Sequence, residues 1–102
     1  MVRYRVVILP GARKMFARHV QFLARINKNA AKSLRGEFSA TVKEIQDNPL
    51  LFPLNDLDVR DFRKALFGNW YKIIYCIRDH TIYIEAVADC RMNPDHISNH
   101  FQ

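Results

Sequence analysis

The side chains with the clearest capacity for chemistry are cations set among aromatic residues in the second half of the chain, chiefly Arg63 and Lys72. Guanidinium and ammonium groups bind phosphate oxygens and carboxylates, so such a surface could hold a nucleic acid or an acidic protein. Both cations and Glu85 fall in strand-like segments, and we expect all three on one face of a sheet. A solvated face with cross-strand pairs would have the same pattern. The sequence predicts a charged sheet face and leaves its role open.

Motifs for nucleotide hydrolysis, acyl transfer and metal binding are not found in the sequence. The glycines are Gly11, Gly36 and Gly68, which form no phosphate-binding loop, and there is no nucleophile elbow. His96 and His100 are four residues apart, but no carboxylate pattern accompanies them, which disfavours a metal site. We therefore expect no metal and no cofactor.

The length of 102 residues is that of one domain, predicted to span residues 1–102. No window approaches the roughly 18 apolar residues of a membrane span, and the first residues have strand character instead of the apolar run of a signal peptide. Cys76 and Cys90 have no second pair for a metal site, so we expect reduced thiols. Together these features predict a cytoplasmic protein.

The positive charge is concentrated in the first half of the chain. Residues 1–51 carry ten Lys and Arg against three acidic residues, a surplus of +7, whereas residues 52–102 carry six against seven. A formal charge of +6 favours an anionic partner, either nucleic acid or an acidic protein. A basic surface that serves only solubility would give the same numbers.

Three β-rich segments in the second half predict an antiparallel meander: residues 60–68, 69–78 and 81–89. They are rich in β-branched and aromatic residues, and the breaks at Gly68-Asn69 and Asp79-His80 are too short for a helix. A further strand is predicted over residues 3–9, with Tyr4, Val6 and Ile8 on one face.

Two amphipathic helices are predicted between the first strand and the meander. The first begins after Pro10-Gly11 and ends near Asn27, and the second runs from the polar Asn27–Asn29 segment to Asn48, which precedes a proline. Residues 50–54 are apolar but lie between breakers, so we expect a loop packed under the sheet edge. Residues after Pro94 are expected to form one helical turn or a disordered tail.

This element order predicts an α+β fold, β-α-α-β-β-β, with a helical hairpin packed on a mainly antiparallel four-stranded sheet. Alternation then sorts the strand residues between two faces. We expect the helices to cover the apolar face, which carries Tyr71, Ile73, Tyr75 and Ile77. In the last strand we expect Ile82, Ile84, Ala86 and Ala88 on one face and Tyr83, Glu85, Val87 and Asp89 on the other.

The sequence also resembles the RelE/ParE toxin superfamily of bacterial type II toxin–antitoxin modules, often called plasmid stabilisation proteins, over nearly its whole length. The resemblance rests on the following stretches: Tyr4-Arg-Val-Val-Ile-Leu-Pro10, Ala30-Ala31, Asn48-Pro49 with Phe52-Pro53, Phe62 to Asp79, and Ile84-Glu-Ala-Val-Ala-Asp-Cys-Arg91 followed by Pro94. It implies a small basic toxin, neutralised by a cognate antitoxin whose acidic, partly disordered segment wraps the toxin and folds on binding.

The superfamily has two branches, and the resemblance slightly favours the ParE-like one. Members of that branch share the fold and poison DNA gyrase through a protein–protein complex. The short segment after the last strand and the Asn48-Pro49 and Phe52-Pro53 stop are closer to ParE. We therefore expect growth inhibition by action on DNA gyrase.

The alternative is a RelE-like mRNA interferase that cleaves the codon in the ribosomal A site. The resemblance implies that Arg63 and Arg91 clamp phosphate, Lys72 neutralises charge, and His96 stands near the C-terminal titratable position of that branch. A second lysine of that branch falls on Ala65, and the tail lacks a basic helix. These departures weaken the RNase interpretation.

Other questions stay open at the level of sequence. An inactive or solitary module that only binds a partner has the same pattern. A monomer, a dimer and a heterotetramer with antitoxin are all compatible with an exposed strand edge. Phe67, Trp70 and Tyr71 either stack on a ligand or fill the core, and the core interpretation is favoured.

Overall fold

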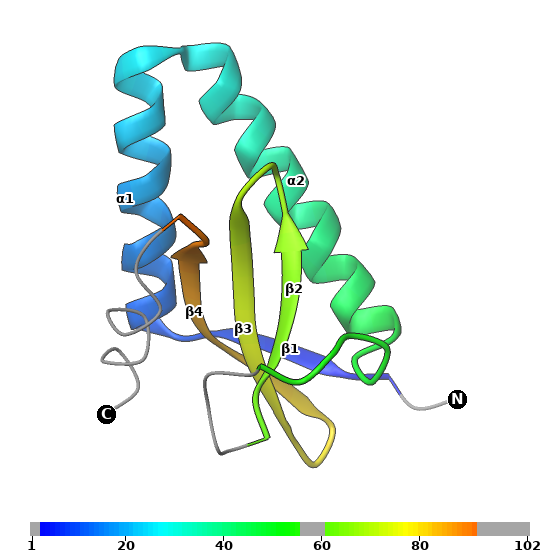
Figure 1. The fold of residues 1–102 in the computed structure, drawn as a ribbon. Coiled ribbons are helices and arrows are strands. Elements are labelled where there is room, and N and C mark those ends of the chain that lie inside the picture. The colour runs from blue at the N-terminus through cyan, green and yellow to red at the C-terminus, as the bar shows by residue number, and fades with distance from the viewer. Residues whose placement is uncertain (1–2, 56–60, 92–102) are drawn as a thin grey trace.

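The computed structural model describes residues 3–55 and 61–91 and confirms the α+β architecture. The elements follow the order β1 (Arg5–Ile8), α1 (Pro10–Ile26), α2 (Lys28–Asp47), β2 (Arg63–Phe67), β3 (Tyr71–Arg78) and β4 (Thr81–Asp89). The strands form one sheet in the order β1-β4-β3-β2, in which β1 is parallel to β4 and the remaining pairs are antiparallel. Figure 1 shows α1 and α2 joined as a hairpin and diverging from their connection.

Helix bounds follow from local chemistry at their ends. Helix α1 begins at Pro10, two residues before the first apolar position, because proline has a helical φ and its missing N–H is not needed in a first turn. Asn27 ends α1 and caps α2, where its side-chain oxygen accepts from the Ala30 amide at 3.1 Å. The helices are thus joined through a single residue, which fixes them as antiparallel neighbours. In the described residues, neither helix is long and apolar enough to cross a membrane.

The helices cover one face of the sheet, called here the helix face, and the main core lies between the helices and this face. Its strand residues include Tyr71, Ile73 and Tyr75, as the alternation predicts, and Tyr4, Val6 and Ile8 pack at its margin. An aromatic cluster joins the layers: Phe16 stacks on Phe38 with ring centroids 4.1 Å apart, and both contact Phe67. Phe67 and Tyr71 are therefore core residues.

A bulge in β4 changes the predicted alternation along this strand. Tyr75 pairs with Ile84 but Ile74 pairs with Ala86, so Glu85 is an extra residue on β4. Beyond the bulge Val87 joins the helix-face core, and Ala86 packs with Ile74 and Cys76 on the other face, called here the second face. Our assignment of Ala86 and Ala88 to the face of Ile84 was wrong, because a bulge shifts the parity of every later residue.

The segment between α2 and β2 contacts the sheet edge, as expected for residues 50–54, but Leu50, Leu51 and Leu54 are exposed and only Phe52 packs against the core. Leu54 forms an isolated bridge with Arg63, and the Lys64 amide donates to the Pro53 carbonyl at 2.9 Å. The ring of Phe52 meets that of Tyr75 edge-on. Tyr75 is fully buried, and its hydroxyl donates to the Pro49 carbonyl at 2.5 Å. This bond anchors the end of α2 to the centre of the sheet.

Removing this hydroxyl by Tyr75→Phe should lower the free energy of unfolding at neutral pH by about 1 to 2 kcal/mol, because the Pro49 carbonyl loses its donor. Burial raises the pKa of Tyr75 from 10.0 to about 12. The folded state thus keeps a proton that the unfolded state releases, so stability is present below about pH 10 and falls as the pH rises toward about 12. Urea unfolding at pH 8 and pH 11 should show this loss in the wild type and a smaller one in Tyr75→Phe. Equal losses in both proteins would contradict it.

Candidate functional site

Arg63 lies on the helix face of the sheet, which corrects the predicted grouping of Arg63 with Lys72. In the β2–β3 register Arg63 is opposite Tyr75, and it shares its face with Ala65 and Phe67. Its guanidinium donates to the Phe52 carbonyl at 2.6 Å. The side chain therefore secures the segment before β2, and the sheet separates it from Lys72.

Lys64, which the sequence interpretation passed over, is the β2 cation on the second face. It is opposite Ile74, and Leu66 is opposite Lys72, so the two lysines are diagonal neighbours whose Cα atoms are about 7 to 8 Å apart. Both lysines act electrostatically on the Cys90 thiol, which places their charges at the end of β4. The inward positions of Ala65 and Phe67 were the signal that could have identified Lys64.

The surroundings of these lysines are mostly buried. Lys72 is only 8% exposed, although it carries an ammonium group. Burial raises the pKa of Cys90, with a further contribution from Asp89, while Lys72 and Lys64 act in the opposite direction. The net shift keeps Cys90 as a thiol, so this residue is not an activated nucleophile. Both cysteines are free.

Arg91, at the end of β4, is engaged by two neighbours. Its guanidinium binds the carboxylate of Asp89, with an Nη2–Oδ2 distance of 2.6 Å, and lies 4.3 Å from the centre of the Trp70 ring. The hydrogen bond from Arg91 lowers the pKa of Asp89, and the same bond raises the pKa of Arg91. Trp70 is 38% exposed, so this cluster forms a partly open corner of the molecule. Arg91 can hold an anion only in competition with Asp89.

A histidine occupies the edge of β4 where β1 has ended. His19 Nε2 is 2.9 Å from the Val87 carbonyl, and the ring contacts Tyr71. This interaction replaces a strand partner for Val87, since the last pair of the β1–β4 ladder is Ile8 and Ile84. His19 thus lies beside the apolar face of α1 and makes a structural contact with the sheet.

The predicted set of Arg63, Lys72, Arg91 and His96 does not assemble as one site in the described residues. Arg63 is on the helix face, Lys72 on the second face, and Arg91 at the end of β4. His96, like His100 and the tail predicted after Pro94, lies outside the described residues. On the second face, Lys64 and the mostly buried Lys72 are diagonal neighbours and contribute positive charge there. In the described chain, no group of three or more His, Cys, Asp or Glu could hold a metal ion.

Comparison with known proteins places these features in a family context. The family model described as the ParE toxin of the type II toxin–antitoxin system, parDE, matches residues 6–94, from the second residue of β1 to three residues beyond Arg91. No curated protein matches the chain.

Proposed function

The chain belongs to the ParE toxin family of type II toxin–antitoxin systems, and from this membership we propose that it inhibits growth by binding DNA gyrase in the cytoplasm. Membership makes it the toxin of such a system and implies an antitoxin partner. Beyond membership of the family, we propose that the target is gyrase and that the chain acts by binding and not by cleavage.

The observation that carries the proposal is the position of Arg63. An interferase needs cations that meet at one scissile phosphate together with a proton donor or acceptor. Arg63 instead holds the Phe52 carbonyl on the helix face, and Arg91 is bound to Asp89. Such an arrangement supports binding through a surface more than catalysis by these arginines.

A supercoiling assay with purified gyrase, relaxed plasmid and ATP tests the proposal. We expect the chain to inhibit supercoiling in proportion to its concentration and to leave relaxation by a type I topoisomerase unchanged. The second reaction is the control, because a protein of charge +6 binds DNA non-specifically and could slow any enzyme that uses it. Equal inhibition of both enzymes, or of neither, would remove gyrase as the specific target.

A second candidate function, ribosome-dependent mRNA cleavage, is favoured by one observation. Lys64 and Lys72 are neighbours on the second face and could together contact a phosphate. Primer extension on cellular mRNA after brief induction separates the two functions. Discrete cuts within translated codons would support the interferase, and growth arrest with intact transcripts would support the gyrase mechanism.

A further inference from the structure

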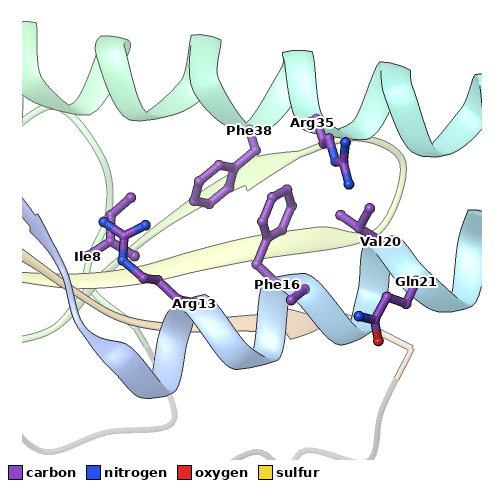
Figure 2. A pocket seen from close by; sticks show the side chains of 8 residues that line it. Ile8, Arg13, Phe16, Val20, Gln21, Arg35 and Phe38 are labelled. Carbon is purple, nitrogen blue, oxygen red and sulfur yellow. The ribbon is translucent and has the colours of Figure 1, made fainter.

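A groove of about 310 Å³ separates α1 from α2 on the outer side of the helical hairpin. It exists because the helices diverge from their one-residue connection (Figure 1). Figure 2 shows Arg13 extending from α1 and Arg35 extending from α2 into the space between the helices, where Phe16 stacks on Phe38. Cations of both helices therefore border the groove.

Helix α1 carries a basic stripe along one side of this groove. The residues of the stripe follow steps of four, three and four, which place them on one face of the helix: Lys14, Arg18, Gln21 and Arg25. All of them are exposed, and Gln21 lines the groove, so the stripe runs along its α1 side. Helix α1 contains no acidic residue that could neutralise these charges.

Helix α2 carries a second basic stripe on the opposite side of the groove. Its residues follow steps of four, three, four and four: Lys28, Lys32, Arg35, Ser39 and Lys43. All of them are exposed, and Arg35 lines the groove. The two stripes therefore flank one groove and share one side of the molecule.

The acidic side chains of α2 do not interrupt the second stripe. The Glu37 carboxylate lies beside Gly68, in the turn between β2 and β3, and Glu44 is seven residues further along the same face. Asp47 is the last residue of the helix. Within the part of the chain that the structure describes, no Lys or Arg of α1 or α2 has an ion pair or a side-chain hydrogen bond. These cations, four from each helix, are called here the basic surface.

The length and uniform charge of the basic surface indicate the class of its partner. From Lys28 to Lys43 the helix rises about 22 Å, at about 1.5 Å per residue, and the partner must be anionic over that length. The backbone of duplex DNA carries one charge per about 1.7 Å of its axis, without interruption. Half of the cations are lysines, which are depleted at protein–protein interfaces and bind phosphate as point charges. Both features favour a nucleic acid over an acidic protein.

We propose that the basic surface binds duplex DNA through its phosphates, with no preference for base sequence. Contacts to phosphate fix the position of a protein on a duplex but carry no sequence information. The choice of DNA as the polyanion rests on the proposed gyrase target, because gyrase acts on duplex DNA. The binding holds the chain on the substrate of its target and so raises the local concentration of the toxin there.

Fluorescence anisotropy with a labelled duplex of about 20 base pairs and the whole chain tests the proposal. Contact with four phosphates gives a slope of about −3.6 for log affinity against log salt, so affinity should fall by about 150-fold between roughly 50 and 200 mM salt. The double variant Arg18→Glu/Lys32→Glu removes one cation from each stripe. It should bind at least about tenfold more weakly than the wild type, with a slope smaller in magnitude by about 2.

A matched control removes the effect of overall charge. Arg5→Glu/Arg78→Glu makes the same change in net charge at two exposed strand positions beside the β3–β4 turn, outside the basic surface. This control should change the affinity for the duplex by less than about threefold. Absence of binding by the wild type, or equal losses in the two double variants, would overturn the proposal.

Competition with unlabelled polyanions distinguishes duplex DNA from other anionic partners. The competitors are single-stranded DNA, an RNA duplex and a polyglutamate peptide, compared at equal total charge with unlabelled duplex DNA. We expect duplex DNA to displace the probe most effectively. Equal or better displacement by any of the other three would overturn the proposal, and polyglutamate would then assign the surface to an acidic protein. The assay contains no gyrase, so a chain that binds the duplex but leaves supercoiling unaffected would refute the gyrase mechanism and leave the DNA-binding surface intact.

Discussion

Truncation of Phe67 to alanine is expected to lower the free energy of unfolding by about 3 to 5 kcal/mol. The ring is 5% exposed and contacts Phe16, Phe38 and Tyr71, so it joins both helices to the β2–β3 hairpin. Removing it leaves a cavity at the centre of the aromatic cluster that rigid helices cannot close. Since small domains are stable by only about 5 to 15 kcal/mol, urea unfolding should show a large shift of the midpoint.

The neighbouring residue supplies the matched control for this prediction. Leu66 is 69% exposed on the second face, and Leu66→Ala should change the free energy of unfolding by less than about 1 kcal/mol. The two substitutions remove similar side chains from adjacent positions of one strand. Equal effects would contradict the register of β2, because a shift of one residue would exchange the faces of Phe67 and Leu66.

Local periodicity was sufficient to predict most of the fold. The bounds of β4 agree with the predicted 81–89, and β3 ends at Arg78 as predicted, because strand pattern and turn residues coincide there. The second helix ends at Asp47, as the Asn48-Pro49 stop predicts. Asp79, in the predicted turn, has φ of 57°, a backbone conformation that aspartate tolerates better than most residues.

The candidate site was harder to predict, because a side chain's face depends on contacts between distant segments. The bulge at Glu85 arises from the pairing of β4 with β3, and no local signal marks it. In β2 the polar Arg63 faces the helices and the apolar Leu66 faces away, the reverse of a binary pattern. Arg63 occupies the first position of its strand, where its long side chain can leave the core and reach the Phe52 carbonyl.

The groove between the helices was also beyond the sequence analysis. The helical periodicity of α1 predicted that this helix is amphipathic. It did not predict that Phe16 would stay partly accessible between diverging helices. The position of Arg13 beside this gap depends on the angle at which α2 leaves Asn27, a property of the two-helix connection and not of either helix alone.

Replacement of Arg63 by alanine should separate a structural role from a catalytic one. The variant loses the charge-assisted hydrogen bond to the Phe52 carbonyl, so we expect the free energy of unfolding to fall by about 1.5 to 3 kcal/mol. The fraction that remains folded should inhibit gyrase as well as the wild type does. Chemical unfolding gives the first quantity, and supercoiling assays normalised to folded protein give the second.

Lys64→Ala is the informative companion, because it removes the adjacent cation from the opposite face of the same strand. We expect its effect on stability to stay below about 1 kcal/mol, since the side chain is partly exposed. If Arg63→Ala left stability unchanged but abolished inhibition, the structural role would be contradicted. Arg63 would then have to contact the target directly instead of the Phe52 carbonyl. If Lys64→Ala alone abolished toxicity, the second face would be the active surface, and mRNA cleavage would become the stronger interpretation.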